Sequence, residues 1–148
     1  MSVSLYGSGQ TVLQVVTATT SSVASTSGST YINTGLSATI TPQSTSSKIL
    51  VIASQQLYVN SNGLVVGSQI ARNSSGVSPS FEYCAWGASS QVMSNVCLQY
   101  LDSPATTSAT TYTTQIKVRA ASGTVYAQYG DGNGQGASYI TLLEISGA

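Results

Sequence analysis

A chain of 148 residues with no net charge is long enough for one domain with its own core. Charged residues make up 5% of it, against about 25% in ordinary globular proteins, and four Lys or Arg beside four Asp or Glu leave no basic surface for nucleic acid. No apolar run approaches a membrane span, and residues 1–10 lack the basic and apolar regions of a signal peptide, so we expect synthesis in the cytoplasm.

The first half of the chain alternates strand patterns with turn-forming residues. Residues 10–20 and 29–42 predict strands, and the second places Leu36, Ala38 and Ile40 on one face, with a kink or bulge near Gly35. Residues 47–59 begin as a continuous apolar run, which predicts a central strand covered on both faces. We expect a hairpin turn at 60–63, a returning strand at 64–72 and a loop at 73–80.

The second half follows the same pattern. We predict strands at 81–87, 90–101, 110–120, 124–130 and 137–147, a proline-containing loop at 102–109 and a glycine-rich tip at 131–136. The strand at 110–120 alternates clearly, with Lys117 and Arg119 on one face and an opposite face made of Tyr112, Thr114, Ile116 and Val118. The apolar set of residues 87–101 fits a helix and a strand equally well, but its Asn, Ser and Val favour the strand.

These patterns predict an all-β protein. Eight or nine antiparallel strands with long crossing connections favour a jelly-roll-like β-sandwich, a single domain over residues 11–148, and residues 1–10 then form an N-terminal arm. A nearly uncharged surface lacks the charge repulsion that keeps proteins apart, so we expect it to be covered by copies of the chain or by another protein.

The residues that usually carry chemistry are scarce. The chain has no His, which excludes Ser–His and Cys–His catalysis, and two cysteines alone cannot hold zinc. Cys84 and Cys97 lie on successive predicted strands; a disulfide is geometrically possible, but two small apolar core thiols are the favoured interpretation. We therefore predict no catalytic residue, no metal site and no cofactor.

Four acids lie scattered along the chain: Glu82, Asp102, Asp131 and Glu144. A glycosidase would need a close carboxylate pair, which Glu82 and Asp102 could supply if they met, but solvated or strand-capping acids are the favoured interpretation. Residues 130–136 suggest a calcium loop or a phosphate cradle, yet they contain one carboxylate and lead into a strand. A hairpin tip between the last two strands is the better prediction.

Aromatic residues supply the candidate contacts with other chains. Tyrosine brings a large contact area and one hydrogen-bonding tip, which suits interfaces, although it is also common in sandwich cores. The candidate interface residues are Tyr6, Tyr31, Tyr58, Trp86 and Tyr129.

Three stretches, taken in order, carry a resemblance to a known group: 19–54, with "TGLSATITP" and "SKILV"; 100–120, with "LDSPATTSATTY"; and "SYITLLEI" at 138–145. Together they make most of the chain similar to small structural proteins of tailed bacteriophages, including cyanophages. The resemblance implies a virion β-sandwich, usually oligomeric and without catalytic residues.

The leading hypothesis is a capsid decoration (cement) protein, a homotrimer on the capsid exterior whose partners are its own copies and the major capsid protein, without nucleic acid or membrane. The alternative is a tail-fibre or receptor-binding module whose loops 73–80 and 130–136 contact a host-surface glycan. A small carbohydrate-binding or hydrolytic sandwich is a third hypothesis, which the absence of His and the scattered acids disfavour.

Overall fold

The computed structural model describes residues 10–82, 91–130 and 136–147. Within these ranges the chain forms ten strands and no helix. It follows that none of the described residues belongs to a helix capable of crossing a membrane. The strands are β1 (Val12–Thr20), β2 (Ala24–Thr26), β3 (Ile32–Ile40), β4 (Lys48–Val59), β5 (Val65–Arg72), β6 (Ser75–Gly76), β7 (Val92–Asp102), β8 (Thr110–Ala120), β9 (Val125–Ala127) and β10 (Ser138–Ile145).

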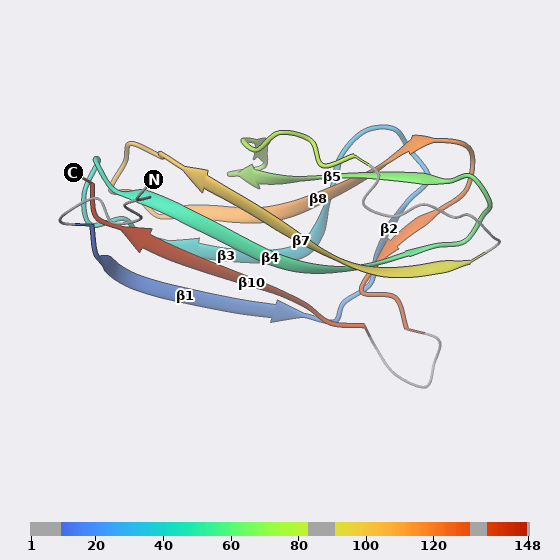
Figure 1. The fold of residues 1–148 in the computed structure, drawn as a ribbon, viewed down its shortest axis with the longest axis horizontal. Helices are drawn as coiled ribbons and strands as arrows, with labels where there is room; N and C mark the ends of the chain where they lie inside the picture. The colour runs from blue at the N-terminus through green and yellow to red at the C-terminus, as the bar shows by residue number, and fades with distance from the viewer. Residues whose placement is uncertain (1–9, 83–90, 131–135, 148) are drawn as a thin grey trace, which may run out of the picture.

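The strands form two antiparallel sheets that pack face to face (Figure 1). In the six-stranded sheet β1 pairs with β10, β10 with β4, and β4 with β7 along its other edge. The short strand β9 follows β10 along the first edge of β4 and pairs in turn with β2. The four-stranded sheet has the order β3-β8-β5-β6.

This strand order is that of a jelly roll. With the short strands β2 and β9 set aside, all but one of the connections pass from one sheet to the other. These crossing connections are β1 to β3, β3 to β4, β4 to β5, β6 to β7, β7 to β8 and β8 to β10. Only β5 and β6 are successive strands that pair directly. Two interleaved Greek keys of this kind define the jelly roll, so the predicted all-β, jelly-roll-like sandwich is confirmed.

The predicted hairpin at residues 60–63 is wrong. The turn is present, with Gly63 at φ +75°, but β4 and β5 belong to different sheets. The reason is burial: Leu57 and Val59 before the turn and Leu64 and Val66 after it all belong to one apolar cluster between the sheets. An arch from one sheet to the other lets both flanks bury their apolar residues against each other. The strands on either side of the glycine-rich segment, β9 and β10, both pair with β4 and not with each other, and beside the segment the Gly136 N–H donates to the Tyr129 carbonyl at 3.1 Å. Residues 131–135 of the predicted tip lie outside the described residues.

The expected irregularity in the second predicted strand is confirmed. In β3, Gly35 has φ +84° and the register with β8 shifts between Asn33 and Ser37. A positive φ is cheap only for glycine, so this residue permits the bulge. Leu36, Ala38 and Ile40 then point into the core, as their alternation predicted.

The central strand β4 is covered on both faces over only part of its length. Its last four residues, 56–59, are all buried, whereas residues 48–54 alternate between buried and partly exposed positions. The first half therefore has one outer face toward solvent, contrary to the prediction. The strand at 90–101 is confirmed as β7, and of the strand predicted at 81–87 only the bridge from Phe81 to Ser68 lies within the described residues.

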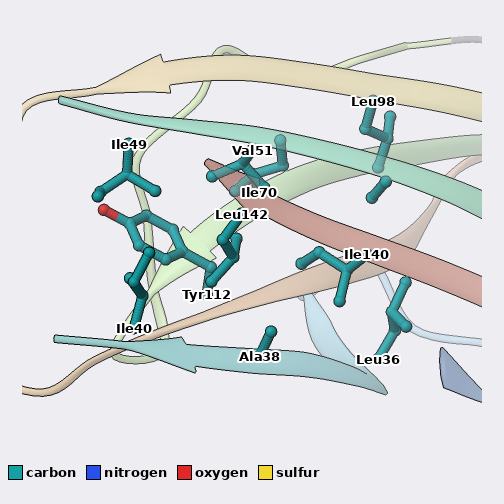
Figure 2. Packing of buried hydrophobic residues seen from close by; sticks show 11 residues of the cluster. Leu36, Ala38, Ile40, Ile49, Val51, Ile70, Leu98, Tyr112, Ile140 and Leu142 are labelled. Atoms are coloured by element: carbon teal, nitrogen blue, oxygen red, sulfur yellow. The ribbon is translucent and has the colours of Figure 1, made fainter. Parts of the chain in front are cut away.

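The core contains two apolar clusters joined by a polar layer. Figure 2 shows the larger one, in which the Tyr112 ring lies among aliphatic side chains from both sheets, including Ile40, Ile49 and Leu142. The smaller one, around Leu57 and Ile116, fills the other end of the sandwich. The layer between them is a connected hydrogen-bond network made by buried side chains of Thr34, Gln55, Thr114, Gln128 and Ser138.

The hydrogen bonds within this layer are short. The Thr114 hydroxyl donates to Gln55 Oε1 at 2.7 Å and contacts the Thr34 hydroxyl at 2.6 Å. The Gln55 and Gln128 amides each hydrogen-bond the Ser138 hydroxyl at 2.9 Å. A buried polar group costs stability unless it is paired. This network therefore favours one alignment of the two sheets over alignments in which these partners no longer meet.

Candidate functional site

The acids within the described ranges serve structural roles. No group of three or more His, Cys, Asp or Glu residues that could hold a metal ion occurs among the described residues. Glu82 pairs with Arg119 at 2.7 Å and lies 3.9 Å from the Lys117 ammonium. Asp102 forms a separate ion pair with Arg72 at 2.7 Å. Glu82 and Asp102 thus have different cationic partners, and the structure does not join them into a catalytic pair.

Two acids are buried, which corrects the expectation of solvated or strand-capping carboxylates. Asp102 is 6% exposed and Glu144 is fully buried. Glu144 accepts hydrogen bonds from Gln14 Nε2 at 2.5 Å and from the backbone N–H of Gln43 at 2.7 Å. Burial by itself raises the pKa of Glu144, but the hydrogen bonds donated to its carboxylate outweigh burial and hold the pKa below its usual range. Asp131 lies outside the described residues.

Asp102 closes one end of the larger cluster. Its Oδ2 accepts a hydrogen bond from the Tyr112 hydroxyl at 2.6 Å as well as from Arg72 Nη1. Burial raises the pKa of Tyr112, and the hydrogen bond to Asp102 adds to that effect. The tyrosine therefore acts as a neutral donor that anchors the carboxylate.

For Cys97 the expected free thiol is confirmed, but its expected place in the core is wrong. This residue is exposed on β7. The alternation of β7 explains the placement, because Leu98 points into the core and Cys97 therefore points outward. Cys84 lies outside the described residues.

Of the five candidate interface residues, the structure brings Tyr58 and Tyr129 together. Tyr58 on β4 stacks on Tyr129 with ring centroids 4.1 Å apart and an interplanar angle of 12°. Tyr126 on β9 completes the cluster, 5.6 Å from Tyr58 and 5.3 Å from Tyr129. Register explains the grouping, because Tyr58 pairs directly with Tyr126. Sequence analysis missed Tyr126 as a member, since only the pairing of β4 with β9 reveals it.

The remaining candidates lie elsewhere. Tyr31 hydrogen-bonds Ser80 and lies beneath the Lys117 ammonium, which is 4.5 Å from its ring centroid, beside the Glu82 ion pairs. This cation–π contact belongs to the four-stranded sheet, away from Tyr58. Tyr6 and Trp86 lie outside the described residues.

The two sheets present unlike outer surfaces. Of the seven large hydrophobic residues that are exposed in the described ranges, six lie on strands of the six-stranded sheet: Val12, Leu13, Val15, Met93, Leu101 and Tyr139. The seventh, Val23, lies between β1 and β2. The four-stranded sheet has none of these residues; its strand β8 carries Lys117 and Arg119 instead.

Two of the open hollows in the described part of the chain lie on different sheets. One, of about 410 Å³, lies on the four-stranded sheet and is lined by hydroxyl, amide and backbone groups of Asn33, Gly35, Ser37, Asn73, Ser74, Thr111 and Thr113. The other, of about 350 Å³, lies on the six-stranded sheet and is lined by Gln56, Met93, Ser94, Asn95 and Gly136. Neither hollow has a charged lining residue, so each suits an uncharged polar ligand or a protein surface better than an ion.

The fold and these surfaces define the chain as a single-domain jelly roll with one polar and one apolar outer face. No family model matches it, and no curated protein matches it. Its similarity to solved structures is distant, and these include structures of infectious bursal disease virus. A structure of the Gx strain shares 14% identity at a TM-score of 0.41, over 90% of this chain and 40% of that one.

Two further structures of the same virus give similar values. Virus-derived T=1 particles share 13% identity at a TM-score of 0.44, over 93% of this chain and 38% of theirs. A VP2 subviral particle shares 16% identity at a TM-score of 0.36, over 93% of this chain and 40% of its own. The chain thus spans about two fifths of the length of these proteins. Similarity at this level has no bearing on function, and the fold assignment depends on the strand order alone.

Proposed function

We propose that this chain is a virion structural protein that decorates the outside of an assembled bacteriophage head. The observation that supports this best is a jelly roll whose six-stranded sheet exposes apolar side chains on an almost uncharged face. Such a face is stable in water only when something covers it. The jelly roll is a common architecture of capsid domains, and the sequence motifs resemble structural proteins of tailed phages.

The proposed mechanism is mechanical. A protein that binds the assembled shell and not its free subunits stabilises the shell by mass action. The chain is made in the host cytoplasm and acts on the capsid exterior as a homotrimer, in contact with the major capsid protein. Residues 1–10 form an arm that reaches a neighbouring subunit, and Tyr6, Tyr31, Tyr58, Trp86 and Tyr129 are the proposed aromatic contacts.

Capsid attachment tests this proposal directly. The purified chain is mixed with empty heads of the phage that encodes it, and bound chain is measured after the heads are sedimented. We expect the full chain to saturate the heads and a variant without residues 1–10 to stay in the supernatant. Circular dichroism of the truncated variant controls for folding. Undiminished binding without residues 1–10 contradicts the arm, and no binding by the full chain contradicts decoration.

One observation favours a second candidate, a tail-fibre or receptor-binding module. The hollow on the four-stranded sheet offers an uncharged lining to which the loop residues Asn73 and Ser74 contribute. Both residues have positive φ angles, 48° and 71°, and form the two-residue turn between β5 and β6, where the Asn73 Oδ1 accepts a hydrogen bond from the Thr111 N–H. Amides and hydroxyls without charge suit a glycan on the host surface. Immunogold labelling separates the candidates, because decoration labels the head and a receptor-binding module labels the tail.

A further inference from the structure

The strongest unassigned feature is a row of aliphatic side chains that crosses the outer face of the six-stranded sheet. Register places Val15 beside Leu143, Leu143 beside Leu50 and Leu50 beside Leu101. Their neighbours along the strands, such as Leu142 and Val51, point into the core, so these four point outward. We call these four residues the apolar row. Val15 is 55% exposed and Leu101 is 47% exposed, at its two ends.

The surroundings of the row carry one charge. Beyond Val15 the strand β1 adds Val12, which is 54% exposed, and Leu13, which is 38% exposed. On one side the next row consists of Thr17, Thr141, Ile52 and Gln99. On the other side Lys48 lies two residues from Leu50 on the same face of β4. The acids on these strands, Asp102 and Glu144, are buried. An apolar centre with a mostly neutral polar rim is the usual composition of a protein interface.

The edges of the sheet are also open among the described residues. Within that part of the chain β1 pairs only with β10 and β7 only with β4, and β1 contains neither charge nor proline over its nine residues. Natural proteins normally protect such edges with lysine, proline or a bulge near the strand centre. Here the register irregularity of β1 is confined to its start, between Val12 and Gln14. An unprotected edge beside an exposed apolar row marks this side of the sandwich as a contact surface.

We propose that this face of the six-stranded sheet, centred on the apolar row, is the surface through which copies of this chain assemble with one another. Charge favours a second copy as the occupant, because the chain has zero net charge and the row presents no charge that its own copy would repel. The neutral Thr and Gln of the rim can hydrogen-bond the same groups of a copy. A basic partner would find no exposed complementary charge on the strands of this face, and an acidic partner would find only Lys48.

The area of the face agrees with this assignment. Four neighbouring strands span about 19 Å, and the nine residues of β1 extend about 30 Å. The projected area is therefore roughly 600 Å², and the accessible area of a surface with side chains is larger. A specific interface needs about 800 Å² from each partner, so one sheet face is of sufficient size.

The test is the oligomeric state of the purified chain without any capsid. We expect sedimentation velocity to show an assembled species, and Val15→Glu or Leu101→Glu to weaken assembly by about 100-fold or more, because each copy then brings a charge into the contact. Leu101→Gln, which adds no charge, should weaken assembly less. Ser37→Glu is the matched control, since Ser37 is exposed on the outer face of β3 in the other sheet, and it should leave assembly unchanged.

This inference rests on the proposed function only for the number of copies that assemble. The outcomes of the test distinguish a failure of the inference from a failure of the proposed function. A monomeric wild-type chain overturns the inference, as does undiminished assembly of folded Val15→Glu and Leu101→Glu variants. A monomer whose binding to empty heads is lost in Leu101→Glu also overturns it, because the face then docks on the shell. In that case the decoration function stands. Circular dichroism of each variant confirms that the sandwich is intact.

Discussion

The buried carboxylate of Asp102 offers the sharpest test of how the sandwich is held together. It lies at the end of β7 in the six-stranded sheet and accepts hydrogen bonds from two residues of the other sheet, Arg72 at 2.7 Å and Tyr112 at 2.6 Å. Asp102→Ala removes both contacts at once. We expect a loss of stability without a change of fold, because the apolar cluster beside it is unchanged.

The magnitude follows from the two contacts. Tyr112 is fully buried, so its hydroxyl loses its hydrogen bond to Asp102 without access to water, at a cost of about 1–3 kcal/mol. The Arg72 side chain is 31% exposed, so solvent screens its ion pair and we count at most about 1 kcal/mol for it. Together the expected loss is about 1–4 kcal/mol. With a urea m-value of about 2 kcal/mol/M, the unfolding midpoint falls by about 0.5–2 M.

The assay is urea unfolding at neutral pH, followed by tyrosine fluorescence and circular dichroism. Tyr112→Phe is the diagnostic second change, since it removes the hydroxyl that Asp102→Ala leaves unpaired. Added to Asp102→Ala, it should recover about 1 kcal/mol, whereas alone it should cost a similar amount. An unchanged midpoint in Asp102→Ala, or a further fall when Tyr112→Phe is added, would refute this reasoning.

Two further predictions concern local features. The pKa of Glu144 is lowered in the folded state, so its stabilising effect is complete above the unfolded pKa of about 4.3 and is lost as pH falls through the folded value. Glu144→Gln should therefore lose about 1–2 kcal/mol at pH 7 and flatten the acid limb of thermal unfolding; an acid limb as steep as that of the wild type would count against it. Gly123 has φ +144°, and a Cβ there would collide with Ser61 and Leu64. Gly123→Ala should cost at least about 1 kcal/mol in urea unfolding, whereas a stabilised variant would show that the turn is not constrained.

Local patterns in the sequence predicted the individual strands well. β8 has the predicted bounds, 110–120, because its apolar and cationic residues alternate without interruption. The irregularity at Gly35 followed from a glycine inside a strand pattern. Both features depend on neighbours within a few residues, which is the range over which sequence patterns are informative.

Which sheet each strand joins could not be predicted in the same way. The turn at 60–63 has ordinary turn chemistry, and only the burial of Leu57 and Leu64 against each other makes it an arch. The buried state of Glu144 likewise depends on donors far away in the chain, Gln14 and Gln43. A lone acid in a strand pattern gives no sign of such partners.

The candidate surface shows the same limit. Tyr58 and Tyr129 were identified separately, but their stacking requires the arrangement of β9 beside β4. The apolar row takes one residue from each of four strands, so no single segment of sequence reveals it. Tyr31 was grouped with them by residue type, and its contacts with Ser80 and Lys117 place it on the other sheet.

The central claim is that this jelly roll works as part of an assembled phage head. A cryo-electron microscopy reconstruction of the phage that encodes the chain tests that claim most directly. The account predicts symmetric density over the outer head surface into which the two sheets fit, with the apolar faces turned toward sister copies. Heads without such density, or density for this chain at the tail alone, would contradict it.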